Sequence, residues 1–139
     1  MSLERTFAII KPDAVAAGQA GEILAMIEKA GFRILALRMT RLTEAQAKGF
    51  YAVHSAKPFF AGLVKFMTEG PIVVMALERG DAIRKWREVM GATDPAKAAE
   101  GTIRKRFGAG IERNCVHGSD AADTAETEVR FFFSTADLL

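Results

Sequence analysis

Ile72-Val73-Val74-Met75-Ala76-Leu77 is the stretch of the sequence that decides the fold. Six consecutive apolar residues after the helix-ending pair Gly70-Pro71 predict a strand buried inside a sheet. Apolar residues then recur every three or four positions from about Asp81 to Met90, which predicts a helix. The remaining elements are assigned outward from this strand and helix.

Two more strands are predicted upstream. Phe7-Ala8-Ile9-Ile10 is a short apolar run that ends at Lys11-Pro12, so we expect a buried strand with a lysine at its C-terminal tip. The second strand is expected from Ile34 to Met39. Between them, Asp13 is expected to cap a helical stretch that Gly31 ends.

The other predicted elements complete an α+β pattern. Thr43-Glu44-Ala45-Gln46 fits a capping box, and Pro58 is expected to start a helix that ends at Gly70-Pro71. Val116 is expected in a short strand. A last helix is predicted from Ser119 or Asp120 to about Phe133, with Ala122 among its core-facing residues. This order predicts an α+β sandwich in which helices cover one side of a four-stranded antiparallel sheet.

Residues 91–116 show little periodicity. Asp94-Pro95 and Thr102 are typical caps of two short helical turns, which Gly101 separates and Gly108 closes. A long connection of this kind in a small domain is more often functional than idle.

The composition indicates one globular domain over residues 1–139. Half of the residues are hydrophobic and 26% are charged, and no apolar stretch is long enough to span a membrane. The net charge of +2, without a run of like charges, indicates no nucleic-acid partner. The single cysteine, Cys115, cannot form an internal disulfide, so we expect a cytoplasmic protein.

His117 is the candidate nucleophile. It lies in Asn114-Cys115-Val116-His117-Gly118-Ser119-Asp120, where Gly118 leaves space beside the ring and Ser119 adds a hydroxyl. A neutral imidazole is nucleophilic near pH 7, although a lone histidine is more often structural. Glu128, on the flank of the last helix, could hold one ring nitrogen and leave the other free to attack. Taken alone, Glu128 is a solvated helix charge.

Phosphate binding would have to come from scattered side chains, because the sequence has no phosphate-binding glycine loop. The candidates are Lys11 at a strand tip, Arg87 on a helix, Arg104 in the 91–116 region, and the Thr93 hydroxyl. Each one alone is more often a surface residue. Together they would form a cationic cradle for a transferring phosphoryl group.

Phe59 is the candidate for stacking on a base. It is adjacent to Phe60, which belongs to a buried apolar stripe, so Phe59 is rotated toward the helix edge. The alternative is that both rings lie in the core. His54 is interpreted as structural, and one cysteine with two distant histidines forms no zinc site.

The chain resembles the nucleoside diphosphate kinase family from end to end. Five stretches in the family's order carry the resemblance: residues 5–13 (RTFAIIKPD), 54–60 (HSAKPFF), 70–74 (GPIVV), 91–95 (GATDP) and 114–120 (NCVHGSD). The resemblance implies a ferredoxin-like domain. It also implies reversible transfer of the γ-phosphate of a nucleoside triphosphate such as ATP to a nucleoside diphosphate, supplying NTPs and dNTPs with low base specificity.

Site roles follow from the same resemblance. His117 would be the nucleophile through Nδ1, with Glu128 and Ser119 positioning its ring. Lys11 would contact the γ-phosphate and the 3′-hydroxyl, with Tyr51 close by. The other implied contacts are Arg87, Thr93 and Arg104 to phosphates, Asn114 to the sugar, and Phe59 to the base, with Ile111 opposite. Mg²⁺ would travel on the nucleotide phosphates with no direct protein ligand, and the family assembles tetramers or hexamers from dimers.

Two other functions compete with this prediction. A ferredoxin-like RNA-binding domain would need aromatic residues along its central strands, and residues 72–77 have none. A member of the family that binds nucleotide or a partner without turnover is the second alternative, although every catalytic residue type is present.

Overall fold

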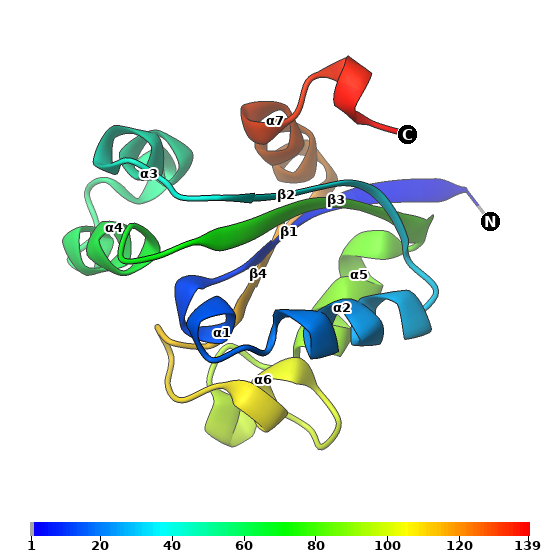
Figure 1. Ribbon diagram of the computed structural model, residues 1–139, viewed down its shortest axis with the longest axis horizontal. Helices are drawn as coiled ribbons and strands as arrows, with labels where there is room; N and C mark the ends of the chain where they lie inside the picture. Colours follow the sequence, from blue (N-terminus) through cyan, green and yellow to red (C-terminus); the bar gives the residue numbers. More distant parts are fainter. Residues whose placement is uncertain (1) are drawn as a thin grey trace.

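The computed structural model describes residues 2–139. Four strands, β1 (Leu3–Ile10), β2 (Arg33–Thr40), β3 (Ile72–Gly80) and β4 (Val116–Gly118), form an antiparallel sheet in the order β2-β3-β1-β4 (Figure 1). The predicted fold class is therefore confirmed. The helices are α1 (Pro12–Ala16), α2 (Ala20–Lys29), α3 (Glu44–Phe50), α4 (Phe60–Met67), α5 (Ala82–Met90), α6 (Ile103–Phe107) and α7 (Ala122–Phe132), with 3-10 turns at Ala52–His54, Pro95–Lys97 and Thr135–Asp137.

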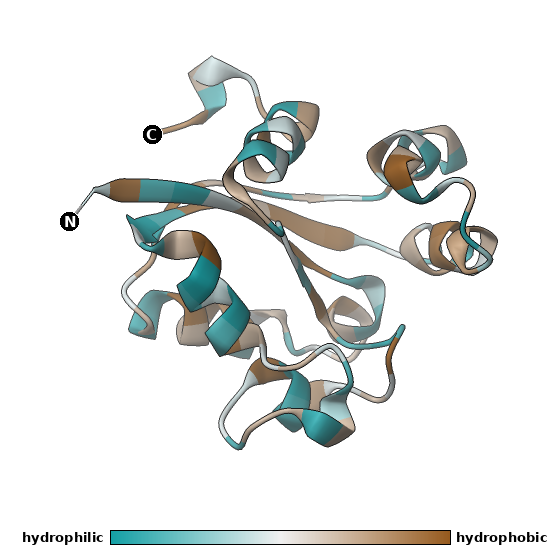
Figure 2. Cartoon of the chain, turned by 180° about the vertical axis from the view of Figure 1, so that it is seen from behind, coloured by the Kyte–Doolittle hydropathy of each residue, from teal (hydrophilic) through white to brown (hydrophobic). Residues whose placement is uncertain are grey.

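Helices cover both sides of the sheet, and the prediction of one covered side is wrong (Figure 1). Alternate residues of β3 explain the difference, because their side chains point to opposite faces. Val74 packs with residues of α3, α4 and α7, whereas Val73 and Met75 pack with residues of α1, α2, α5 and α6. Figure 2 shows the apolar character of the central strands between these two layers.

This arrangement contradicts the alternative of an RNA-binding domain, because the sheet formed within residues 2–139 has no open face. Such a domain stacks bases on an open sheet face, and both faces of this sheet are buried under helices. Among the helices of residues 2–139, none combines the length and apolar character that crossing a bilayer requires.

The stretch between β1 and β2 forms two helices, which differs from the prediction. Gly18 has φ +73°, a left-handed conformation that favours glycine, and it separates α1 from α2. Asp13 does not cap the first helix. Lys11 occupies the N-cap position and Pro12 the first turn, so the Asp13 carboxylate is free to bind elsewhere.

Two other helix starts also differ from the sequence prediction. Pro58 lies in a tight turn, where Phe60 N donates to Lys57 O, so α4 begins only at Phe60. Ser119 continues the strand pairing, because its N–H donates to Phe7 O, and α7 begins after it at Ala122. Ala122 is consequently exposed and not in the core.

The capping predictions are confirmed at three helices. Thr43 and Gln46 form the capping box of α3. Asp94 accepts from Ala96 N at the 3-10 turn, and Thr102 caps α6, which ends at Gly108. Residues 91–116 therefore contain a capped 3-10 turn and a capped short helix.

Strand β4 is held in place by α5. The buried indole of Trp86 donates to His117 O at 3.2 Å. A Cβ on Gly118 would lie 2.5 Å from Trp86 Cδ1 and 2.7 Å from Met90 Cε. Only glycine allows β4 to pack this closely against α5. This close packing helps to position His117, the residue before Gly118, in the strand.

Candidate active site

The His117 ring is fixed by a short chain of hydrogen bonds. Its Nε2 lies 2.8 Å from Glu128 Oε1, and Ser119 Oγ donates to the same oxygen at 3.0 Å. Ser119 Oγ in turn accepts from Phe7 N at 3.3 Å, which anchors the chain to β1. A carboxylate accepts only, so Nε2 carries the proton and Nδ1 is the basic nitrogen. Nδ1 makes no hydrogen bond within residues 2–139.

Local structure explains why these residues meet. His117 pairs with Ile9 in the β1–β4 register, and Glu128 lies on the face of α7 that turns toward β4. Aromatic edges of Phe7, Phe50 and Tyr51 surround the imidazole at centroid distances of 5.5 to 6.2 Å. The imidazole is therefore held among three aromatic rings as well as by Glu128.

A cavity of about 620 Å³ lies against His117. Nine of the ten site residues predicted from the sequence line it, and Ser119 lies behind Glu128. The nine are Lys11, Tyr51, Phe59, Arg87, Thr93, Arg104, Asn114, His117 and Glu128. The lining of the cavity comes from β4, from helices α3, α4, α5, α6 and α7, from the 91–116 segment and from Lys11, which follows β1.

Lys11 is a buried ammonium on the cavity wall. Its Nζ donates to Asn114 Oδ1 at 2.8 Å, and the Asn114 amide donates to Thr93 O and Ile111 O. Burial, with the neighbouring charge of Arg104 as the next cause, lowers the pKa of Lys11 to about 8. An anion in the cavity would favour the charged form of this lysine.

Arg104 is held by the main chain. Its guanidinium donates to the carbonyl oxygens of Asn114, Gly91 and Val116 at 2.8 to 3.3 Å. Burial lowers the pKa of Arg104 to about 10, with repulsion from Arg87 as the next cause. The fixed guanidinium keeps two of its five N–H groups for other acceptors.

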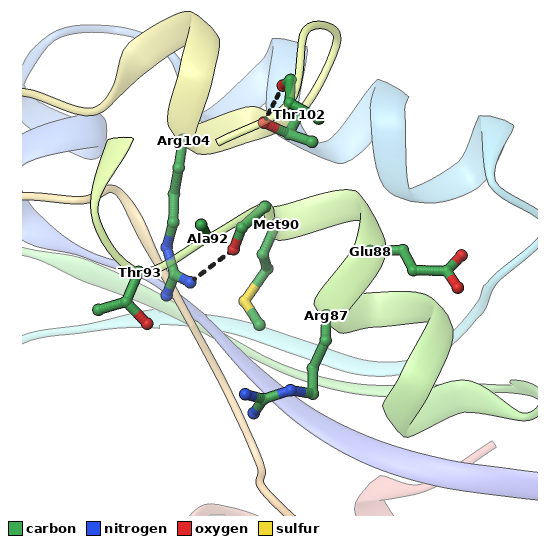
Figure 3. A pocket seen from close by; sticks show the side chains of 9 residues that line it. Arg87, Glu88, Met90, Ala92, Thr93, Thr102 and Arg104 are labelled. Atoms are coloured by element: carbon green, nitrogen blue, oxygen red, sulfur yellow. Dashed lines mark hydrogen bonds between the residues drawn. The ribbon is translucent and has the colours of Figure 1, made fainter. Parts of the chain in front are cut away.

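Arg87 lies at the mouth of the cavity. Its side chain is exposed and forms an ion pair with Asp120 at 3.0 Å. A smaller cavity of about 460 Å³ adjoins the first and shares Arg87, Met90, Thr93 and Arg104 with it. In Figure 3, Glu88 points away from the two arginines, so cationic groups dominate this end of the site.

Tyr51 and Phe59 supply the aromatic groups. The Tyr51 hydroxyl is buried and has no hydrogen-bond partner in the described part of the chain. Burial and the charge of Glu128 raise the pKa of Tyr51, so the phenol is a proton donor. Phe59 is 51% exposed and lines the cavity with the exposed Ile111, whereas Phe60 packs against the core.

The structure adds seven residues to the lining that the sequence did not predict there. They are Phe50, Val53, His54, Leu63, Met90, Glu112 and Thr124. His54 is interpreted from the sequence as structural, yet it lies on the cavity wall with its ring 5.5 Å from Phe59. The sequence signals for it were its position five residues before Phe59 and its place in the family-like stretch 54–60.

The comparisons with known proteins agree with this geometry. The family model described as nucleoside diphosphate kinase matches residues 4–138. A nucleoside diphosphate kinase of Syntrophotalea carbinolica is 60% identical over 99% of this chain and 100% of its own. One from Anaeromyxobacter sp. is 59% identical over 96% of this chain and 91% of its own.

Two solved structures share the whole fold. The nucleoside diphosphate kinase of Aquifex aeolicus superposes with a TM-score of 0.97 at 42% identity, covering 99% of this chain and 100% of that one. A halophilic enzyme from Halobacterium salinarum, described in complex with CDP, has a TM-score of 0.95 at 42% identity, with 99% and 92% covered.

Fold, site and relatives together define a phosphotransferase. Within that class, the chain belongs to the nucleoside diphosphate kinase family.

Proposed function

We propose that this enzyme moves a phosphoryl group in two half-reactions with His117 as the carrier. In the first, Nδ1 attacks the γ-phosphorus of a nucleoside triphosphate such as ATP. The N–P bond forms while the bond from phosphorus to the β–γ bridging oxygen breaks, and the nucleoside diphosphate leaves with that oxygen. In the second, a terminal oxygen of another diphosphate attacks the phosphohistidine and restores the free ring.

One observation carries the proposal: Glu128 occupies Nε2 of His117 and leaves Nδ1 beside a cavity lined by Lys11, Arg87 and Arg104. The ring gains positive charge as the N–P bond forms, and the Glu128 carboxylate stabilises that charge. Ser119 acts through Glu128, because its hydroxyl donates to the carboxylate. The arrangement supplies a positioned nucleophile and its electrostatic support.

The cations of the cavity suit phosphate oxygens. Lys11 and Arg104 both have a lowered pKa, since each is buried beside another positive charge. A triphosphate would supply the missing negative charge. We assign Lys11, Arg87, Arg104 and Thr93 to the phosphates, Asn114 to the sugar, and the Tyr51 hydroxyl to a position near the Lys11 contact.

The base would lie between Phe59 and Ile111. Both side chains are exposed at the cavity mouth, and stacking on such groups depends little on which base is present. This supports low base specificity and the production of both NTPs and dNTPs. The CDP named for the Halobacterium salinarum relative is consistent with a pyrimidine in such a site.

Mg²⁺ fits this donor set as an ion bound by the nucleotide. Two of the three carboxylates of the lining are engaged, Glu128 with His117 and Ser119, and Asp120 with Arg87. When bound, Mg²⁺ would neutralise phosphate charge and orient the chain of phosphates. A tetramer or hexamer built from dimers and a cytoplasmic location also remain part of this proposal, on the strength of the family.

The test is a two-step labelling experiment. The protein is mixed with γ-labelled ATP and Mg²⁺, separated from nucleotide, and then given GDP or CDP. We expect an acid-labile, base-stable phosphoprotein that transfers its label to either diphosphate, and no label on a His117→Ala variant. Label on His117→Ala, or a stable phosphoprotein that no diphosphate discharges, would refute the proposal.

A further inference from the structure

Asp13 is a charged residue that the proposed reaction leaves without a role. It lies in the first turn of α1 and does not cap that helix. Its Oδ2 accepts a hydrogen bond from Cys115 N at 3.2 Å, across 102 positions of sequence. Its other oxygen, Oδ1, is buried and accepts no hydrogen bond within residues 2–139.

The partner of Asp13 is a strained residue. Cys115 has φ +75°, a left-handed conformation that costs a residue with a side chain about 1 kcal/mol or more unless its surroundings hold it. Two hydrogen bonds hold the Cys115 peptide groups: Cys115 N donates to Asp13, and Cys115 O accepts from Lys11 N at 2.7 Å. Lys11 is the N-cap residue of α1, and Asp13 lies in the first turn of that helix.

This strained peptide separates two parts of the site. On one side is Asn114, whose Oδ1 accepts from the Lys11 ammonium at 2.8 Å and whose carbonyl accepts from Arg104. On the other side begins β4, with His117 two residues further on. A change in the Cys115 backbone would therefore rotate Asn114 against Lys11 and move two cations relative to the nucleophile.

We infer that Asp13 is a positioning residue: its carboxylate clamps the left-handed Cys115 peptide and thereby holds Asn114 and Lys11 in register with His117. This inference rests on the proposed function, since it assigns Asp13 a part in the same site. Asp13 does not line the cavity and has no place among the groups that touch the nucleotide.

The charge of Asp13 adds a second effect on Lys11. The groups that face Lys11 are Arg104 from α6, Asp13 from α1, Glu112 and Cys115 from the segment before β4, and the ring of Phe66 from α4. Burial and Arg104 lower the pKa of Lys11, while Asp13 is the first of the groups that oppose them. The Cys115 thiol is not a competing anion at neutral pH, because burial raises its pKa to about 12.

Two variants separate the clamp from the charge. Asp13→Asn keeps an oxygen that can accept from Cys115 N but removes the charge, whereas Asp13→Ala removes both. Glu28→Gln is the matched control, because it removes an exposed carboxylate of α2 that lies outside the site.

The first readout needs no activity. The titration of Lys11 is followed in the free protein through the ¹³Cε signal of labelled lysine, assigned with a Lys11→Arg variant. We expect Asp13→Asn to move this titration to lower pH by on the order of one pH unit, and Glu28→Gln to leave it unchanged. An unchanged Lys11 titration in Asp13→Asn overturns the electrostatic part of the inference.

The second readout is the pH dependence of phosphotransfer. We expect the basic limb of kcat/KM to shift acidward in Asp13→Asn, with activity near pH 6.5 largely retained. Asp13→Ala should also raise the KM for nucleotides by about tenfold or more at that pH, because Asn114 and Lys11 lose their alignment.

A purely structural role gives a different result. If the folded Asp13→Ala protein melts at lower temperature but keeps the wild-type KM and pH profile, the positioning role is refuted. If the wild-type protein itself fails to transfer phosphate, the proposed function fails, and the Lys11 titration still decides the effect of Asp13.

Discussion

Replacing Glu128 by glutamine removes one charge from the site and little else. The glutamine oxygen can still accept from His117 Nε2 and from Ser119 Oγ, which now contact Glu128 Oε1 at 2.8 and 3.0 Å. What is lost is the attraction between the carboxylate and the positive charge that the ring acquires during transfer. A hydrogen bond to a charged group contributes about 1.5–3 kcal/mol, so His117 phosphorylation should slow by roughly 10- to 150-fold.

Rapid-quench measurement of His117 phosphorylation in a single turnover isolates this step from product release. Glu126→Gln is the matched control, because Glu126 lies on the same helix and forms only an exposed pair with Arg130. We expect Glu128→Gln to be slow with a near-normal apparent Kd for ATP, and Glu126→Gln to behave as wild type. Equal rate constants in the two variants would refute the assigned role of Glu128.

Three further predictions concern other parts of the molecule. The folded protein holds the pKa of Lys11 near 8, whereas its ordinary value is 10.5, so burial of the charged lysine destabilises the fold below pH 8. This penalty disappears as the pH rises to about 10.5, and the free energy of urea unfolding should therefore increase over that window. An equal increase in a Lys11→Met variant would contradict this prediction. Phe59→Ala should raise the KM for purine and pyrimidine nucleotides alike, by roughly tenfold, because one stacking surface is lost; a loss confined to one base would contradict simple stacking. Gly118→Ala should lower the free energy of unfolding by about 1–3 kcal/mol, since its Cβ would lie 2.5 Å from Trp86 Cδ1. Gly21→Ala is the control and should not destabilise the protein, because no atom lies within 4 Å of the added Cβ. Equal free energies of unfolding in the two variants would contradict the prediction and show that β4 can shift to accommodate the methyl group.

The sequence predicts the strands best where both faces are buried. Residues 72–77 of β3 are apolar without interruption because each side chain packs under a helix, so the signal is strong. The first residues of β1 were not predicted, since Leu3, Glu4 and Arg5 lie at an exposed end of the strand. Helix starts were less predictable, because Pro58 and Ser119 are each used in a turn or a strand pair instead of a cap.

The site residues were predicted from their chemistry, while their contacts depend on strand pairing. Nothing within residues 5–13 shows that Lys11 binds Asn114, or that Asp13 binds Cys115, because both contacts form only when β1 pairs with β4. The exposure of Phe59 was predicted only as one of two alternatives, because its angle to Phe60 indicated an edge position while a core position for both rings stayed open. The lining role of His54 was not, since a 3-10 turn directs its side chain.

The most direct test locates the phosphorus on the carrier ring. The protein is labelled with ¹⁵N-histidine and phosphorylated with ATP and Mg²⁺, and the ³¹P–¹⁵N coupling identifies the nitrogen that holds the phosphoryl group. Because Glu128 occupies Nε2, we predict that the coupling falls on Nδ1 of His117. Phosphorus on Nε2, or on an oxygen of any serine, would contradict the account.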